Sequence, residues 1–328
     1  MGGPVPELFL AVSTNPAIDR VAALRGPATG VVKAAALLET PGGKAIHTAM
    51  IASRLGGRAA VITTAGGRSG ELLLELLTDE DFAVRGVEVA GPTRGTYTLV
   101  SEGQADLVEV HEPSSPLSPA ECDALVAALV EYDRPRAVVA VCGSLPPDSP
   151  GDLHARLVAA ARGRGDYTVL DCSTPEALAA GLEAGPDLVA PNLAEARRLL
   201  GEETEAPVPD EAGLARLATA VRALGAGSVW LSAGAGGSVF ADSRGTFHML
   251  APEPPPAVNA VGCGDALVGG FAAGILAGDA ALAAAGLGVA AATEKLGHLH
   301  PGHVDPDRVR SLRAGIVTRE LTGVEGAA

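Results

Sequence analysis

Short apolar runs that alternate with helical segments constrain the fold of this chain more than any other feature of its sequence. Continuous apolarity over only a few residues is typical of strands that are covered on both faces. Strands and helices in alternation, joined by short connections, predict a parallel sheet with right-handed crossovers and helices on both faces, which is a doubly wound α/β fold. The expected strands are residues 8–12, 59–63, 137–141, 168–170, 188–190 and 229–231. The expected helices are residues 44–55, 70–77, 119–132, 153–162, 176–182, 193–200 and 211–224.

Two regions, residues 20–40 and 84–112, break this alternation. They contain shorter β-like pieces, Gly-rich turns and no long helix, and the pattern along residues 96–99 predicts a half-exposed antiparallel sheet. We expect the two regions to form one small sheet that stands off the main body as a lid. Because an uncovered sheet edge invites pairing, a homodimer through this lid is also expected.

The most apolar stretch, residues 266–293, does not predict a membrane span. Asp279 divides it into segments of 13 and 14 residues, whereas a helix needs about 20 apolar residues to cross a bilayer. We therefore expect two buried core helices. The first residues lack the basic and apolar regions of a signal peptide, and we expect a soluble protein of the cytoplasm.

Composition narrows the class of protein further. The chain has 328 residues and a formal net charge of −15, which argues against a nucleic-acid or anionic-membrane surface. Aromatic residues make up 3% of the chain, too few for base-stacking platforms. At about 150 residues per domain, this length allows two domains or one large α/β unit with an appendage. None of the four cysteines lies in a C-x-x-C pair, so a zinc ribbon or a redox motif is not expected.

The segment N-A-V-G-C-G-D at residues 259–265, where the apolar stretch begins, carries the strongest chemical signal. Gly262 and Gly264 let successive backbone N–H groups, including that of Cys263, converge on an anion, and the helix N-terminus adds positive potential. Asp265 can cap the helix, and it can also take a proton from a hydroxyl beside that anion. Phosphoryl transfer needs such a base together with donors for the transferred charge. Taken alone, the segment is explained equally well as a capped helix after a glycine turn.

This segment and five others, in order, make the chain resemble the PfkB (ribokinase-like) family of carbohydrate kinases, nearest its branch of 1-phosphofructokinases and tagatose-6-phosphate kinases. The family signature resembles D-T-x-G-A-G-D. The resemblance implies one ribokinase-like domain over residues 1–328, with the β lid, and transfer of phosphate from ATP, with Mg²⁺, to a sugar hydroxyl. The other matching segments are T-N-P-A-I-D at 14–19, G-G-K at 42–44, T-R at 93–94, G-S-L-P at 143–146 and P-N-x-x-E at 191–195.

The resemblance places a sugar site on residues that also have a physical reading of their own. Asn15 and Asp19 follow the first strand, where α/β sheets collect ligands, although, taken alone, this motif is better explained as an ordinary Asx-capped turn. A glycine pair lets the backbone approach a sugar closely. Family position implies that Lys33 and Arg94 face a sugar phosphate, and the implied acceptor is a hexose phosphate, best matched by fructose 1-phosphate. The residues assigned to the sugar are Asn15, Asp19, Lys33, Gly42, Gly43, Lys44, His47, Arg94 and Ser144.

The nucleotide side is assigned to the second half of the chain. In the family, the Asn-x-x-Glu element helps to organise Mg²⁺ through waters, which suits a metal that keeps its water shell. The same two residues also predict a capping box at a helix start, and both interpretations can hold at once. The resemblance assigns Asn192, Ser232, Gly234, Gly237 and Gly264 to ATP, Glu195 to Mg²⁺ through water, and Asp265 to the catalytic base.

The chain departs from the family pattern at four positions. Ala190 stands where the family usually has lysine, which removes one positive charge near the phosphates. Ala45 and His47 replace the glycine and asparagine that follow Gly-Gly-Lys, and Ala260 replaces a threonine. His47 can still hydrogen-bond a sugar hydroxyl, and its charge depends on its surroundings. The phosphoryl-transfer segment is therefore kept, while the sugar-recognition residues have diverged.

The sequence is also compatible with other interpretations. The group His298, His300 and His303 has the spacing of zinc ligands, but a C-terminal loop is the simpler interpretation because no cysteine or carboxylate cluster completes a ligand set. The alternative functions are a kinase for an unphosphorylated sugar or nucleoside and a non-catalytic sugar- or nucleotide-binding sensor. A dinucleotide-dependent dehydrogenase is disfavoured, because no G-x-G-x-x-G follows the first strand.

Overall fold

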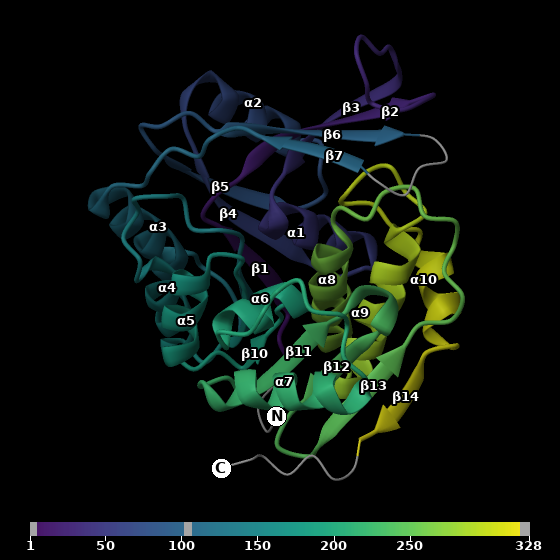
Figure 1. Cartoon of the computed structure of the whole chain (residues 1–328). Coiled ribbons are helices and arrows are strands. Elements are labelled where there is room, and N and C mark those ends of the chain that lie inside the picture. Colours follow the sequence, from purple (N-terminus) through teal and green to yellow (C-terminus); the bar gives the residue numbers. More distant parts are fainter. Residues whose placement is uncertain (1–4, 102–106, 322–328) are drawn as a thin grey trace.

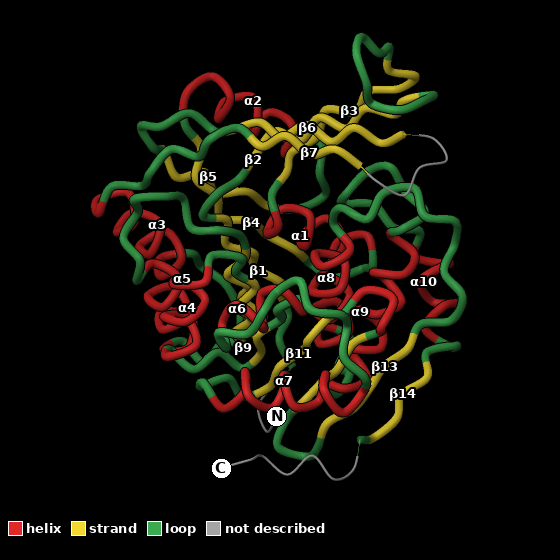
Figure 2. Tube along the Cα trace, in the orientation of Figure 1, coloured by secondary structure: helices red, strands yellow, loops and turns green. Residues whose placement is uncertain are grey.

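The structure is a computed structural model that describes residues 5–101 and 107–321. Its centre is a twisted sheet that runs through the whole body (Figures 1 and 2). Seven parallel strands are followed at one end by three antiparallel ones, in the order β14-β13-β12-β11-β10-β9-β8-β1-β4-β5. The parallel strands are β1 (Leu8–Ser13), β4 (Ala59–Ala65), β5 (Ala83–Glu88), β8 (Ala137–Cys142), β9 (Tyr167–Asp171), β10 (Leu188–Val189) and β11 (Ser228–Ser232). The antiparallel strands are β12 (Ser238–Ala241), β13 (Thr246–Leu250) and β14 (Val317–Glu320).

Helices cover both faces of this sheet, as the alternating pattern predicts. One face carries α3 (Pro119–Glu131), α4 (Leu153–Gly163), α5 (Pro175–Glu183), α6 (Leu193–Leu199) and α7 (Glu211–Ala223). The other face carries α1 (Lys44–Arg54), α2 (Gly67–Leu77), α8 (Cys263–Leu276) and α9 (Ala281–Lys295), with α10 (Pro306–Arg313) packed against α9. A doubly wound α/β fold is thereby confirmed.

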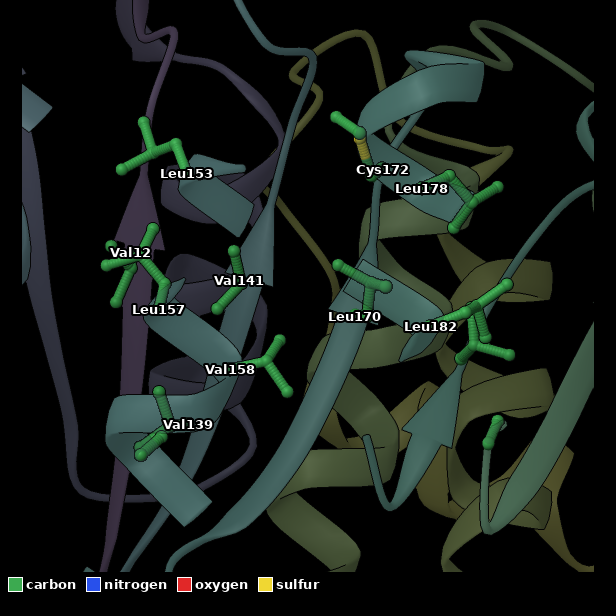
Figure 3. Packing of buried hydrophobic residues seen from close by; sticks show 14 of the residues in the cluster. Val12, Val139, Val141, Leu153, Leu157, Val158, Leu170, Cys172, Leu178 and Leu182 are labelled. Carbon is green, nitrogen blue, oxygen red and sulfur yellow. The ribbon is translucent and has the colours of Figure 1, made fainter. Parts of the chain in front are cut away.

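Two hydrophobic cores result, because successive side chains of a strand point to opposite faces. In β1, Leu10 and Val12 pack into the core under α3 to α7, whereas Phe9 and Ala11 pack into the core under α1, α8 and α9. Figure 3 shows the first core, where Leu157 of α4 lies against side chains of β1 and β8. The strands are therefore apolar on both faces, which is why short apolar runs in the sequence predicted them.

The apolar stretch that begins near residue 263 forms the two buried helices α8 and α9, as predicted. They pack very closely: a Cβ atom added at Gly270 would lie 2.7 Å from the Cα atom of Gly288. Glycine is required at both positions, because any side chain there would push the helices apart. In the described part of the chain, no helix is long and apolar enough to cross a membrane.

A second, smaller sheet stands apart from the main one, at the top of Figure 1. Its order is β3-β2-β6-β7, formed by β2 (Ala17–Leu24), β3 (Ala34–Gly42), β6 (Arg94–Ser101) and β7 (Leu107–His111). The separate lid sheet was predicted from residues 20–40 and 84–112, of which 102–106 lie outside the described residues.

Two details of the lid prediction are wrong. Strand β5, within the predicted second region, pairs with β4 in the main sheet, because its exposed edge position gives it the mixed polarity of a lid strand. The lid is also not purely antiparallel: β2 and β6 run parallel, from Ala17 opposite Arg94 to Leu24 opposite Ser101. The strands β12 to β14, at the far edge of the main sheet, were not predicted at all.

Candidate active site

The predicted site residues gather at the carboxyl ends of the parallel strands. Strand β1 lies between β4 and β8, so the chain winds outward from it in both directions. In sheets of this kind, a crevice forms at such a reversal of strand order, and ligands bind there. Asn15 follows β1, Ser144 follows β8, and Asn192 follows β10. The lid strand β2 starts two residues after Asn15, so the lid begins at the rim of the same crevice.

The sugar side of the crevice is a connected polar cluster around Asn15. Its Nδ2 group donates to Ser144 Oγ (2.8 Å) and to Ser114 Oγ (2.9 Å). Arg94 Nε donates to Asn15 Oδ1 (3.2 Å), which leaves the rest of the guanidinium for a ligand. These side chains and Lys44 line a cavity of about 410 Å³. Asn15, Arg94 and Ser144 therefore lie together as predicted, and Ser114 is a member that no motif indicated.

Gly42 and Gly43 allow the end of the lid strand β3 to pack closely against the sugar-side residue Asp19. A Cβ atom added at Gly42 would lie 2.2 Å from the Asp19 carboxyl carbon, so only glycine leaves this carboxylate in place. Gly43 is the N-cap of α1 and has a φ of 101°, in the region that favours glycine. Thr96 of the lid strand β6 donates from Oγ1 to Asp19 Oδ1 (2.5 Å). The Asp19 carboxylate is thus held between the two lid segments.

His47 bridges two carboxylates at the centre of the site. Its Nδ1 atom lies 2.9 Å from Asp265 Oδ2 and its Nε2 atom lies 2.9 Å from Asp19 Oδ2, the latter as an ion contact without hydrogen-bond alignment. Burial lowers the pKa of His47, but the two carboxylates outweigh burial and raise it to about 9. At neutral pH His47 is therefore a buried imidazolium. Burial raises the pKa of Asp19, but its close contact with the positively charged His47, together with the hydrogen bond from Thr96, brings the net value below the ordinary one.

The start of α8 has the features of an anion site, with one change from the prediction. Gly262 caps the helix in the left-handed region (φ 87°), where a Cβ atom would lie 2.4 Å from the Pro301 carbonyl oxygen. The N–H of Cys263 donates to the Ala260 carbonyl (3.2 Å). Of the predicted anion-hole amides, that of Cys263 is therefore already engaged, whereas Gly264 is exposed and has open space around its Cα. Asp265 lies in the same turn, only 6% exposed.

Lys44 takes part in a charged cluster rather than standing free for a sugar phosphate. Its Nζ atom donates to Asp171 Oδ1 (2.7 Å) and lies 3.6 Å from Glu195 Oε1. Burial lowers the pKa of Lys44, but the carboxylates of Asp171, Glu195 and Asp265 raise it above its ordinary value. Burial raises the pKa of Asp171 to about 6, which Lys44 opposes. Asp171, at the end of β9, was not predicted, although an acidic residue directly after a buried strand could have indicated it.

The nucleotide-side residues lie at the ends of β10 and β11. Asn192 Oδ1 accepts from the Glu195 N–H (2.9 Å), and Glu195 Oε2 accepts from the Asn192 N–H (2.9 Å), which is the predicted capping box. Asn192 pairs with Ser232 in an isolated β-bridge, so the two predicted nucleotide contacts lie side by side. Gly234 begins a single 3₁₀ turn and Gly237 directly follows it, with φ values of 56° and 81°.

Lys33 and the histidine group are not part of this constellation. Lys33 is exposed and precedes Ala34, which lies eight residues before Gly42 on β3, roughly 26 Å along an extended strand. Its role at the sugar phosphate remains a prediction. The histidines near the C-terminal end form a loop in which His298 Nε2 contacts Glu294 Oε1 (2.6 Å). Within the described residues, no group of three or more metal-ligating side chains could hold a metal.

Fold and site together define a class. A doubly wound sheet with a separate lid, a carboxylate in the first turn of a glycine-capped helix, and a polar crevice are the parts of a small-molecule kinase with the ribokinase-like fold.

Comparison with known proteins assigns the chain to a family. The model of the family described as "pfkB family carbohydrate kinase" matches residues 12–307. The chain therefore belongs to this family of phosphotransferases that act on sugar hydroxyls. It is 32% identical to a 1-phosphofructokinase of Rhodobacter capsulatus over 319 residues, covering 95% of this chain and 98% of the relative. Phosphofructokinase-2 from Escherichia coli, solved with potassium, aligns at a TM-score of 0.83 and 27% identity, covering 95% of this chain and 99% of the other. The same enzyme solved with fructose-6-phosphate gives 0.80 and 27% with the same coverage.

Proposed function

We propose that this kinase transfers the terminal phosphoryl group of ATP to a hydroxyl of a hexose phosphate, with fructose 1-phosphate or a close relative as the acceptor. One observation carries the proposal: the Asp265 carboxylate lies at the N-terminus of α8, and His47 connects it to the sugar-side carboxylate Asp19. A base and a sugar-binding group are thus joined in one buried cluster. The identity to a protein named 1-phosphofructokinase supports a phosphorylated acceptor.

The chemistry follows from what each group does at its own position. Asp19 accepts hydrogen bonds from sugar hydroxyls, and Asn15 can accept or donate them. These bonds orient the acceptor in the crevice. The hydroxyl that points at α8 gives its proton to Asp265 as its oxygen attacks the terminal phosphorus of ATP. The bond between that phosphorus and the β–γ bridging oxygen breaks at the same time, and ADP leaves. The N-terminus of α8, with the Gly264 amide, stabilises the charge that spreads over the transferred group. Positive charge on Lys44 and on the buried His47 keeps the neighbouring carboxylates from repelling the phosphates.

The nucleotide residues support ATP as the phosphate donor. Asn192 and Ser232 lie side by side at neighbouring strand ends, and the turn from Gly234 to Gly237 leaves a bare backbone surface next to them. A backbone without side chains lets a nucleotide approach closely. We infer that ATP lies across these strand ends with its phosphates directed at Gly264 and Asp265.

Mg²⁺ fits the acidic pair beside the phosphate position. The Asp171 carboxylate at the end of β9 and Glu195 Oε1 in the first turn of α6 converge on Lys44, and both are hard oxygen ligands of the type that Mg²⁺ prefers. Two carboxylates rather than a complete protein shell suit a metal that retains its waters and also binds phosphate oxygens. Glu195 and Asp171 would hold the ion through waters, and Mg²⁺ would neutralise charge on the phosphates during transfer.

Arg94 is the residue with which the acceptor can be tested. Its guanidinium lines the crevice and is anchored by Asn15. Charge-assisted hydrogen bonds contribute about 1.5–3 kcal/mol each, so Arg94→Ala should raise the KM for a phosphorylated sugar roughly tenfold or more. It should scarcely alter the use of an uncharged sugar.

The experiment is an ADP-release panel of sugars, sugar 1-phosphates, sugar 6-phosphates and nucleosides, run with wild type and Arg94→Ala side by side. Turnover of a hexose phosphate that depends on Arg94 supports the proposal. Turnover confined to uncharged acceptors, without an effect of Arg94→Ala, would replace it with a sugar or nucleoside kinase. Intact ATP binding without turnover of any acceptor would point to a sensor.

We further propose that the lid pairs with a second copy of the chain. Strands β3 and β7 are the two edges of the lid sheet, and both carry exposed apolar side chains. Leu37 is 65% exposed, Val108 is 45% exposed and Val110 is 52% exposed. An unprotected edge with apolar residues is a ready interface between identical chains. Pairing of two lids would cover these residues in both chains.

A further inference from the structure

Lys295 is a fully buried lysine that the proposed phosphoryl transfer does not use. It is the last residue of α9 and has no exposed surface. Its Nζ atom donates to two backbone carbonyl oxygens, those of Asn259 (2.8 Å) and His298 (3.1 Å). Within the described part of the chain, it forms no ion pair with a carboxylate. The ammonium group is thus bound almost entirely by the backbone.

The two carbonyls belong to different loops that meet beside the anion site. Asn259 opens the loop that leads into Gly262 and α8, and His298 lies in the loop that follows α9. Further bonds join the same loops: Val258 N–H donates to the Leu296 carbonyl (2.7 Å), and Asn259 Nδ2 donates to the Leu299 carbonyl (2.8 Å). Lys295 is the charged member of this junction, and the junction sets the position of the first turn of α8.

A buried ammonium needs a physical reason, because removal of a charge from water is costly. Backbone carbonyl oxygens from several loops are also the ligands with which proteins bind bare monovalent cations such as K⁺. The C-terminal end of α9, where carbonyl groups point outward, adds negative potential at the same place. The surroundings of Lys295 Nζ therefore have the chemistry of a monovalent-cation site whose cation is supplied by the chain itself.

We propose that the Lys295 ammonium serves as a tethered monovalent cation that positions the loop before α8, and so the anion site, and that it makes the enzyme independent of K⁺. Lys295 is a positioning residue in this account, since it touches neither substrate. The proposal rests on the proposed phosphoryl transfer for its activity assay only. Its stability assay needs no acceptor, so failure of the one can be distinguished from failure of the other.

The test is chemical rescue of Lys295→Ala by free cations. Truncation leaves a space lined by carbonyl oxygens, which K⁺ or NH₄⁺ can enter and which the much larger tetramethylammonium ion cannot. At equal ionic strength, we expect kcat of the variant to fall about tenfold or more in tetramethylammonium chloride and to recover in KCl or NH₄Cl as the site fills. The midpoint of thermal unfolding of the variant, measured without substrates, should rise with KCl in the same concentration range.

Lys295→Met is the matched control, because its uncharged side chain fills the space. We expect its kcat to be reduced with little change in the KM for ATP, and no salt should restore it. Wild type should change less than about twofold between the salts. Activation of wild type by K⁺, wild-type activity of Lys295→Met, or failure of both K⁺ and NH₄⁺ to restore Lys295→Ala would each overturn the proposal. If Lys295→Ala folds only in K⁺ or NH₄⁺, that result is itself the rescue; if it folds in no salt, the kcat of Lys295→Met decides.

Discussion

Replacement of His47 by asparagine should change how the stability of the protein depends on pH. The pKa of His47 is raised from an ordinary value of 6.5 to about 9 because Asp19 and Asp265 hold its proton. A group with a raised pKa binds its proton more tightly in the folded state than in the unfolded state. Its contribution to stability is therefore fully present below pH 6.5 and is lost as the pH rises through about 9.

The size of the effect follows from these two values. Each pH unit between them corresponds to about 1.4 kcal/mol, so the protonated bridge contributes on the order of 3 kcal/mol to the free energy of unfolding. Other buried histidines do not interfere in this window. The pKa values of His154 and His300 are lowered by burial to about 4, so their contributions change below pH 6.5.

Urea unfolding of wild type and His47→Asn over a pH series measures the difference. Between about pH 7 and pH 9, the free energy of unfolding of wild type should fall more steeply than that of the variant, by up to about 1.4 kcal/mol per pH unit. The control is His111→Asn, which removes an exposed histidine on β7 and should keep the wild-type slope. Parallel curves for wild type and His47→Asn would show that His47 is not a buried imidazolium.

Two other outcomes are expected. Asp265→Asn should lower kcat by about 10²–10⁴-fold while ATP still binds, as calorimetry with ATP would show, because the base is lost and the backbone of α8 is kept; equal turnover would remove Asp265 from the base role. Small-angle scattering should report a mass of two chains, and Val108→Lys together with Val110→Lys on β7 should reduce it to one; a monomeric wild type, with and without substrates, would refute the lid interface.

The main sheet could be predicted because its strands are buried on both faces. Residues such as Phe9 and Leu10 point into different cores, so the run has no polar residue and stands out in the sequence. Strand β14 has no such mark, because all of its residues are exposed. The parallel pairing of β2 with β6 could not be predicted for a different reason. The two strands are distant in sequence, and such a pairing leaves no local pattern in either strand.

The site was predictable where the backbone imposes a residue type. There is no room for a side chain at Gly42 and Gly262, so glycine is required at both positions. The motifs that contain these glycines can therefore be recognised in the sequence. Asp171 was not predicted because it ends its strand without belonging to any recognisable motif. Its ion pair with Lys44 could not be predicted from the numbers of positive and negative residues. The double contact of His47 needs three segments in one place, which only the folded chain supplies.

The lid is assembled from two pieces of chain that are not adjacent in sequence. Ala17 of β2 pairs with Arg94 of β6, and β3, α1, β4, α2 and β5 lie between the two strands along the chain. This arrangement gives the lid a high contact order, because its central strand pair closes a long loop that must itself fold. The lid therefore cannot be exchanged between kinases as one contiguous segment. An exchange of substrate specificity by lid grafting would need both segments, together with the βαβ unit that holds them in register.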